Sequence, residues 1–463
     1  MRLDQGRLTQ LGDSLQGEVL VPEDAGYEEA STIWNARLAR RPGAVVCCES
    51  SADVQAAVHF ARENRLPAAI KGGGHDFAGN SVCDGGLVID LSRLNGVSVD
   101  PGRRVVLAGG GATWGAVDQA TQVHGLATTG GTVSTVGVAG YTLGGGTGYL
   151  TRRFGLGLDN LLSAEIVTAD GQIRKVSGSD HPDLFWALRG GGGNFGVVTS
   201  FEFRLHQVGP EVLAGQIIHP LQDAPQALTF YRHFMAHAPV ELQCYAFIVP
   251  IPPLDVFPAE LHGSPALDLV TVYSGTPSQG EEIIRPLRDH GTPLFDDVQT
   301  CHYVDVQKMF DAGAGKGNRW YSRGQYIGEL SDEAITTALS FARNLHGEFT
   351  MVYFEPLGGA VGQADRSKTA FAHRDAAFSF HILTGWADPG SDDQNMEWTR
   401  AFHKAMAAYA SGGVYLNLLS PDEAHRVSDA YGTSYRRLAE LKARYDPDNL
   451  FRFNHNILPK GSA

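Results

Sequence analysis

The chain has 463 residues, a formal net charge of −14, 43% hydrophobic residues and 19% charged residues. The length exceeds what one hydrophobic core usually serves and the composition is that of a soluble globular protein, so we expect two domains. The acidic balance argues against nucleic acid as a partner, because phosphate backbones are bound by clustered lysine and arginine.

Other partners and compartments are also disfavoured. The pairs Arg103-Arg104 and Arg152-Arg153 are too small to form a basic patch, and we expect both on a solvated surface. The sequence contains no secretory signal pattern and no run of 18 apolar residues, so we expect no membrane association. Five cysteines without framework spacing fit a reducing cytosol, and the lack of H-E-x-x-H and C-x-x-C predicts no metal site.

The first part of the chain alternates strand and helix patterns after a lead-in at 1–37. One predicted helix has Val54, Ala57, Val58 and Ala61 on its apolar face and Ser51 as its cap; a second is capped by Thr113. Predicted strands cover 45–48, 68–70, 87–91, 105–108, 164–168 and 172–176, of which the last two form a hairpin.

Residues 71–79, Lys-Gly-Gly-Gly-His-Asp-Phe-Ala-Gly, follow one of these strands. Glycines let the backbone approach a bound group, and their successive N–H groups can form an anion site. His75 would then stand beside a phosphate-bearing cofactor that it could touch or bond covalently. The alternative is an ordinary glycine-rich turn.

A second glycine-rich segment spans 130–148 and fits neither helix nor strand periodicity. It predicts a long loop lying flat against a large ligand. Apolar anchors such as Val136, Val138 and Leu143 argue against a flexible linker, because such linkers lack them.

The third segment, 188–199, contains G-x-G-x-x-G at 191–196. A dinucleotide fingerprint should follow a strand and open a helix. Here a helix around Pro182, capped by Asp180 or Ser179, precedes the glycines and a strand at 197–203 follows them. We therefore reject a Rossmann interpretation. Residues 313–317 also fail as a P-loop, because no Ser or Thr follows Lys316.

The pattern changes from about residue 211. Helical stretches at 224–237, 332–344 and 393–410 alternate with strand-like runs at 212–218, 243–249, 267–273, 349–355 and 377–384. They predict an antiparallel sheet covered by helices. Alternation puts Tyr353 and Glu355 on one face of their strand. His381 lies in mid-strand, where a hydrogen-bonded core histidine is the alternative to a site residue.

The fourth segment, 445–456, begins Tyr-Asp-Pro-Asp-Asn-Leu-Phe-Arg and follows a helix that stops before Pro447. Its aromatic residues predict that it packs back onto a domain.

Together the four segments resemble the FAD-linked oxidases of the vanillyl-alcohol oxidase / p-cresol methylhydroxylase superfamily, in the berberine-bridge-enzyme-like branch. The family's G-G-G-H matches 72–75, its flavin-flanking loop 130–148, its L-R-G-G-G-x-N-F-G 188–196 and its Y-D-P-x-N-x-F-R 445–452.

The resemblance implies an α+β fold. Its FAD-binding domain, of the PCMH type with two subdomains, would span 38–208 and its substrate domain 209–424, with 425–463 returning to the FAD-binding domain. FAD is the implied cofactor, bonded through His75. Many members bond the flavin a second time through a cysteine, but Val133 stands at that position, so we expect one bond, as in singly linked bacterial relatives such as 6-hydroxynicotine oxidase and polyketide-pathway flavoproteins.

Candidate site residues combine the motifs with the resemblance. Tyr415, in a Y-x-N segment that faces the flavin in the family, is the expected base, although a free tyrosine has a pKa near 10 and needs help from neighbours. The other catalytic candidates are Tyr353, Glu355, His381 and Tyr141. The expected cofactor-binding residues are His75, Lys71, Gly72, Gly73, Gly74, Asp76, Gly79, Thr132, Val133, Val136, Gly137, Gly140, Gly144, Gly145, Gly148, Val198, Asn454 and Asn456.

The expected activity is that of an FAD-dependent oxidase taking a hydride from a C–H beside an amine or hydroxyl of a small organic or secondary-metabolite substrate. Val136 stands where the family's oxidases carry valine, which favours O2 as acceptor and H2O2 as product. Two alternatives remain open: a flavin dehydrogenase or monooxygenase-like enzyme of a polyketide pathway, and a non-catalytic flavin-binding protein. The expected partners are a small-molecule substrate and O2, and a homodimer would fit the relatives.

Overall fold

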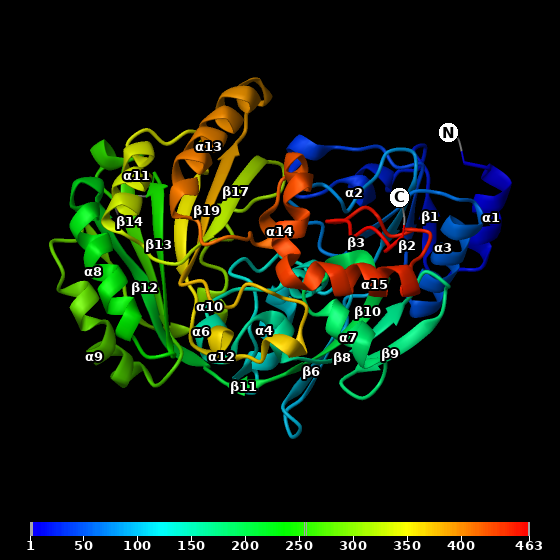
Figure 1. Ribbon diagram of the computed structural model, residues 1–463, viewed down its shortest axis with the longest axis horizontal. Helices are drawn as coiled ribbons and strands as arrows, with labels where there is room; N and C mark the ends of the chain where they lie inside the picture. Colours follow the sequence, from blue (N-terminus) through cyan, green and yellow to red (C-terminus); the bar gives the residue numbers. More distant parts are fainter. Residues whose placement is uncertain (1–2, 254, 256, 462–463) are drawn as a thin grey trace.

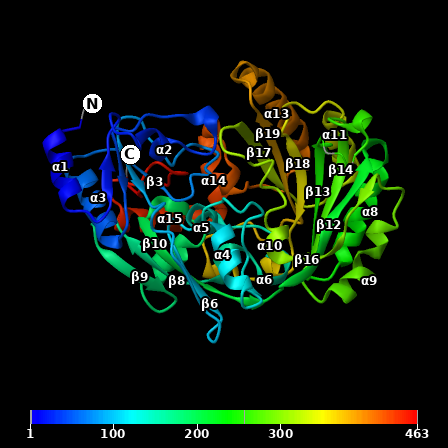
Figure 2. The same ribbon diagram turned by 180° about the vertical axis from the view of Figure 1, so that it is seen from behind.

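The computed structural model describes residues 3–253, 255 and 257–461. Residues 1–2 of the expected lead-in and residues 462–463 of the expected C-terminal segment therefore lie outside it. Figures 1 and 2 show two parts side by side: both chain ends lie in one, and a large sheet with its helices forms the other. In the described residues, no helix is both long enough and apolar enough to cross a membrane.

The N-terminal sheet has the strand order β1-β2-β4-β3, in which β2, β4 and β3 are parallel. Residues of β2 and β4 are buried throughout, as expected for short apolar runs in a parallel sheet. The elements here are α1 (Gln5–Asp13), β1 (Glu18–Leu20), α2 (Tyr27–Ser31), β2 (Ala44–Cys47), α3 (Ser51–Glu63), β3 (Ala68–Lys71) and β4 (Leu87–Asp90).

Helix α3 buries its predicted apolar face, but its cap is Ser50 and not Ser51. The Ser50 hydroxyl accepts a hydrogen bond from the Asp53 amide, whereas Ser51 is already helical. Two adjacent serines give the same capping signal, so the sequence pattern did not choose between them.

The middle sheet is antiparallel with the order β5-β6-β10-β8-β9 and contains the predicted hairpin as β8 and β9. A short pair, β7 with β11, lies beside it. The elements are β5 (Val97–Asp100), β6 (Val105–Gly109), α4 (Trp114–Gln122), β7 (Leu126–Ala127), α5 (Val138–Gly144), α6 (Thr151–Phe154), β8 (Leu161–Val167), β9 (Ile173–Ser177), α7 (Pro182–Leu188), β10 (Val197–Arg204) and β11 (His206–Gln207).

Two local predictions in this region are wrong. Part of the second glycine-rich segment is a helix, α5, which buries Val138, Thr142 and Leu143 between the sheet and the chain that follows. Tertiary packing of this face outweighs the low helix propensity of its glycines. Helix α7 is not capped by Asp180 or Ser179; His181 occupies the cap position in a left-handed conformation, with Pro182 as the first helical residue.

The large sheet is antiparallel, in the order β15-β12-β14-β13-β18-β19-β17 with β16 beside β12. Helices α8, α9, α11 and α13 cover its outer face (Figure 1), and its other face is turned to the part that holds the two smaller sheets. The elements are β12 (Glu211–Pro220), α8 (Ala224–His237), β13 (Leu242–Pro250), β14 (Pro265–Tyr273), α9 (Pro277–Arg288), β15 (Phe295–Asp296), β16 (Gln299–His302), α10 (Tyr303–Val306), β17 (Arg319–Ile327), α11 (Asp332–Ala342), β18 (Met351–Pro356), α12 (Ala360–Gln363), β19 (Phe378–Trp386) and α13 (Asp392–Met406).

The chain then returns to the first part through α14 (Val427–Tyr431) and α15 (Tyr435–Tyr445). Leu438 and Leu441 of α15 join the core cluster that contains Leu184 and Leu188 of α7. Figure 1 shows α15 lying along this part of the molecule.

Arg152 is not on a solvated surface, contrary to the sequence prediction. Its side chain is buried and its guanidinium donates to the carbonyls of Ala238, Pro239 and Leu242, which follow α8 in the other part. Arg103 and Arg104 are exposed as predicted. Arg153 is half-buried and donates to the Ser274 carbonyl at 2.6 Å, so the prediction fails for it as well. A pair of arginines in sequence does not reveal whether the fold supplies carbonyl acceptors for it.

Candidate active site

A cavity of about 350 Å³ lies where the glycine-rich loops of the first part meet the inner face of the large sheet. Its walls come from the segment after β3, from the second and third glycine-rich segments, from Tyr353 and Leu383 of β18 and β19, and from 415–418 and 453–455. It is the one hollow among those found in the described residues that brings these motifs together.

Most of the predicted site residues line this cavity. They are Gly72, Gly73, Gly74, His75, Asp76, Thr132, Val133, Val136, Gly137, Gly140, Val198 and Asn454 from the cofactor set, and Tyr141, Tyr353 and Tyr415 from the catalytic set.

The other predicted residues lie outside the lining. The Lys71 ammonium donates to the carbonyl of Ala30 at 2.6 Å and pairs with Asp90 of β4 at 3.1 Å. Its contacts therefore stabilise the N-terminal sheet. Asn456 lies just beyond the lining residue His455. The remaining ones are Gly79, Gly144, Gly145, Gly148, Glu355 and His381.

Close backbone packing explains several of the glycines. A Cβ on Gly73 would stand 2.5 Å from the backbone of Gly137, so the first two glycine-rich segments touch here and exclude side chains. Gly74 has a φ of +68°, which favours glycine. A Cβ on Gly144 would meet Asn417, so that glycine admits the Y-x-N segment to the cavity wall.

The Asp76 carboxylate shapes the loop after His75. It accepts hydrogen bonds from the amides of Ala78 at 2.8 Å and Ser81 at 3.0 Å, and from the Asn80 amide. The side chain therefore folds the first motif into a tight turn and fixes the backbone that carries His75.

Tyr415 stands at the cavity wall with two donors aimed at its hydroxyl. The Gly146 amide donates to this oxygen at 2.9 Å and the Asn417 side-chain amide at 3.0 Å. The same Asn417 nitrogen donates to the Tyr141 carbonyl at 3.0 Å, which fixes its orientation. Burial raises the pKa of Tyr415 to about 12, and the two hydrogen bonds act against that rise.

Glu355 and His381 lie behind this wall. Burial raises the pKa of Glu355 to about 7, while the Tyr245 hydroxyl donates to its carboxylate at 3.0 Å. His381 is fully buried, shares a 2.6 Å hydrogen bond with the Ser379 hydroxyl and has its pKa lowered to about 3 by burial. Its ring centre is 5.0 Å from that of Tyr353 and 6.1 Å from that of Tyr415.

The residues present fit a dinucleotide cofactor such as FAD. Nine of the lining residues are glycines from the first three motifs, and their backbone leaves room and N–H groups for phosphates. Among the described residues, Asn454 Oδ1 and Asn456 Oδ1 are buried without a hydrogen-bond partner, and both are suited to hydroxyl donors of a bound ligand.

Several lining residues were missed from the sequence. Gly192 and Gly193 belong to the third motif and Asn417 to the Y-x-N segment, so the motifs themselves carried the signal. Leu383 lies two residues after His381 in the same strand, so strand alternation could have placed Leu383 on the same face as His381. His455 lies in the fourth segment between the predicted Asn454 and Asn456, whereas Leu418 carried no comparable signal.

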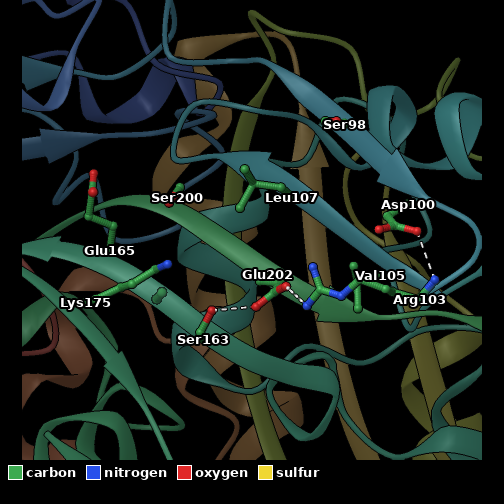
Figure 3. A pocket seen from close by; sticks show the side chains of 11 residues that line it. Ser98, Asp100, Arg103, Val105, Leu107, Ser163, Glu165, Lys175, Ser200 and Glu202 are labelled. Atoms are coloured by element: carbon green, nitrogen blue, oxygen red, sulfur yellow. Dashed lines mark hydrogen bonds and ion pairs between the residues drawn. The ribbon is translucent and has the colours of Figure 1, made fainter. Parts of the chain in front are cut away.

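A second hollow, of about 280 Å³, lies on the outer face of the middle sheet and does not share these residues (Figure 3). Its three carboxylates are already engaged. Glu202 pairs with Arg103 at 3.2 Å and accepts from Ser163 at 2.8 Å, and Asp100 accepts from the Arg103 amide at 2.9 Å (Figure 3). Glu165 accepts from Thr199 at 2.7 Å. We therefore place the active site in the loop-lined cavity.

Comparison with known proteins agrees with this placement. Residues 42–177 match the family model described as FAD binding domain, and residues 414–458 match the model described as berberine and berberine like. An uncharacterized FAD-linked oxidoreductase of Bacillus subtilis is 32% identical, over 96% of this chain and 97% of its own length.

Two further relatives carry names that state an activity. The (R)-6-hydroxynicotine oxidase of Paenarthrobacter nicotinovorans is 31% identical over 97% of this chain and 98% of its own. The crystal structure of 6-hydroxy-D-nicotine oxidase from Arthrobacter nicotinovorans matches with a TM-score of 0.86 and 30% identity, over 96% of this chain and 99% of its own.

Proposed function

The chain belongs to the berberine-like family of FAD-linked oxidoreductases, and from this premise we propose that it is an oxidase of small organic amines or alcohols. The family models and the relatives confirm the family and the fold class that the four motifs predicted, and the FAD-binding domain supports FAD as the cofactor. The proposal adds the reaction: a hydride leaves a substrate C–H beside a nitrogen or hydroxyl, and O2 is the final acceptor, giving H2O2. When bound, FAD supplies the hydride acceptor.

The observation that carries the proposal is the environment of the Tyr415 hydroxyl. Two N–H donors, from Gly146 and Asn417, are aimed at this oxygen at the wall between the glycine loops and the substrate-side sheet. Donors of this kind stabilise a phenolate, the form that can accept the proton of a substrate heteroatom. Tyr415 is therefore the proposed base, and Asn417 its positioning residue.

We propose that Tyr353 orients the substrate, because it lines the same cavity and stands on the strand that faces the loops. Glu355 and His381 lie behind it and are proposed to act through Tyr353 and Tyr415 rather than on the substrate. Tyr141 donates from its hydroxyl to the Thr147 carbonyl at 3.0 Å, which holds the second glycine-rich segment in place.

We also propose that the cofactor is bonded once, through His75. The imidazole lines the cavity, and burial lowers its pKa to about 4, so it is a neutral nucleophile at physiological pH. Val133 lines the same wall and offers no thiol for a second bond.

The test combines colour, activity and one substitution. Yellow colour that stays in the pellet after acid precipitation is expected, together with peroxide release when amines and alcohols are screened in air. Tyr415→Phe should lower kcat/KM roughly 100-fold or more, as loss of a general base does, with FAD retained. Tyr435→Phe, outside the cavity, is the matched control. Slow reoxidation of the reduced protein in air would instead favour the dehydrogenase or monooxygenase-like alternative.

A further inference from the structure

Two residues that were not among the predicted site residues hold the imidazole of His75. The hydroxyl of Thr135 lies 2.8 Å from His75 Nε2. On the ring face, Trp34 stacks on the imidazole with the ring centres 4.6 Å apart and an angle of 23° between the planes. One contact fixes the rotation of the ring and the other fixes its plane.

Trp34 is itself held from the other part of the molecule. Its indole N–H donates to the Ala314 carbonyl at 2.6 Å, and its ring also stacks on Trp320 of β17, with the ring centres 4.9 Å apart. Next to it, Asn35 exchanges hydrogen bonds of 3.0 Å with both backbone groups of Trp320. The lead-in segment thus fixes His75 against the large sheet.

Thr135 sits on an equally fixed segment. The adjacent Ser134 donates from its amide at 2.8 Å and from its hydroxyl at 2.6 Å to the carboxylate of Asp311. Asp311 is the charged group that acts on the imidazole, and its effect is smaller than that of burial, which keeps the ring neutral. A neutral imidazole carries one N–H and one lone pair.

We propose that Thr135 is a positioning residue for covalent attachment of FAD: its hydroxyl oxygen accepts a hydrogen bond from the Nε2–H of His75, so the lone pair of the imidazole lies on Nδ1. Trp34 holds the ring face in the same alignment. No described residue forms a hydrogen bond with Nδ1, so this nitrogen is available to a ligand in the cavity. The inference rests on the proposed linkage through His75.

The atoms and electrons of the attachment reaction balance when O2 is the oxidant. A C–N bond from Nδ1 to the 8α carbon of the flavin replaces one C–H bond of that methyl group. One proton leaves from the methyl carbon and one from Nε2, at the hydrogen bond to Thr135, and the electron pair of the broken C–H bond passes to O2 to give H2O2.

The first test measures covalent incorporation and not turnover. Full-length protein purified from riboflavin-starved cells is mixed with FAD in air, and covalent flavin is followed by fluorescence of the denatured protein. Thr135→Val, which keeps the side-chain shape, should slow incorporation roughly tenfold, equivalent to about 1.4 kcal/mol in the barrier. Thr135→Ser should restore the rate, and Trp34→Ala should be slower than Trp34→Phe. If valine disturbs the loop, Thr135→Ala serves as the second variant that removes the hydroxyl.

Two controls separate this inference from the proposed linkage. Non-covalent FAD affinity, measured before bonding, should be the same in Thr135→Val and the unmodified protein. NMR of the isolated flavin peptide should place the methylene on Nδ1. Equal incorporation rates in Thr135→Val and Thr135→Ser, or attachment through Nε2, would overturn the role of Thr135 while leaving the linkage intact. Unmodified protein that never bonds FAD would overturn the linkage, and this inference with it.

Discussion

At the scale of single residues, two opposed effects act on the pKa of the Tyr415 hydroxyl. Burial raises its pKa, while the donors Gly146 and Asn417 lower it. Only the deprotonated form can act as base, so kcat/KM should rise with pH through the pKa of this group. The hydrogen bonds therefore decide how much of the active form exists at neutral pH.

Asn417→Leu should raise the pKa of Tyr415 further, because it removes one hydrogen bond to the phenolate, of about 1.4 kcal/mol. The range from pH 7 to 10 lies below this pKa, so kcat/KM should fall about tenfold at every pH in that range. The measurement is kcat/KM from pH 7 to 10, with the exposed Asn344→Leu as control. A kcat/KM equal to that of the unmodified protein would contradict the role given to Asn417.

The buried carboxyl group of Glu355 should make the free energy of unfolding of the protein depend on pH. Burial raises its pKa from an ordinary 4.5 to about 7, so between these values the folded chain keeps a proton that the unfolded chain has released. Its contribution to stability therefore falls as the pH rises from 4.5 to 7, by up to about 3 kcal/mol.

Glu355→Gln removes this titration and can still accept the hydrogen bond from Tyr245. The substitution should raise the melting temperature relative to the unmodified protein at pH 8 and change it little at pH 5. Thermal unfolding of the FAD-loaded protein at both pH values measures this, with the exposed Glu348→Gln as control. The same temperature difference at pH 5 and pH 8 would refute the assigned pKa.

At the scale of elements, the C-terminal motif is held by a buried ion pair on α15. The Lys442 ammonium donates to Asp446 at 2.6 Å and to the carbonyls of Asn194 and Phe451 at 2.8 Å each, which uses its three protons. Asp446 in turn accepts from the amides of Leu450 and Phe451. The third and fourth motifs are therefore joined by one lysine.

Lys442→Met should destabilise the protein by about 3–5 kcal/mol, because it leaves the Asp446 carboxylate buried without its partner. Urea unfolding followed by fluorescence measures the change. Lys460→Met removes an exposed lysine that pairs with Glu440 and should be nearly neutral. Equal stability of the two variants would show that the buried pair has no structural role.

Elements with clean periodicity could be predicted from the sequence, and those with mixed composition could not. The helix at 224–237 and the hairpin of β8 and β9 follow their apolar patterns. Strand β17, Arg-Trp-Tyr-Ser-Arg-Gly-Gln-Tyr-Ile, is almost wholly buried yet carries two arginines, and α9 contains Pro286, so both were missed. Arg323 is buried in β17 because it pairs with Asp422 and Glu423, which are distant in the sequence.

The same limit applies to the site. Motifs with glycine reveal close backbone approach wherever they occur, so most of the cofactor cradle was predictable. Trp34 and Thr135 act on His75 only through the fold, because one lies in the lead-in and the other between two motif positions. No local pattern marks a residue whose partner is supplied by tertiary structure.

At the scale of the whole molecule, the cavity lies at the seam between the two parts seen in Figures 1 and 2. Its geometry therefore depends on contacts that fix one part against the other. Arg152 makes such a contact from α6, and Trp34 with Asn35 makes another against β17. Loosening either should disturb the distance between Tyr353 of β18 and the glycine loops without unfolding a core.

Arg152→Met should weaken this docking by about 3 kcal/mol, since it removes charged hydrogen bonds and leaves the carbonyls of Ala238, Pro239 and Leu242 without that donor. Arg152→Lys should rescue only part of the loss, because one ammonium cannot reproduce the planar fork of the guanidinium. The exposed Arg104→Met is the matched control.

Differential scanning calorimetry and limited proteolysis measure the effect of Arg152. We expect the single unfolding transition to broaden or split in Arg152→Met, and cleavage near 207–211, where the chain passes between the parts, to become faster. FAD retention should change less than kcat/KM, because the cradle belongs to one part while Tyr353, which is proposed to orient the substrate, stands on β18 of the other. A variant that unfolds in one sharp transition with unchanged activity would mean that the remaining contacts of the seam, including those of Trp34 and Asn35, fix the two parts without Arg152.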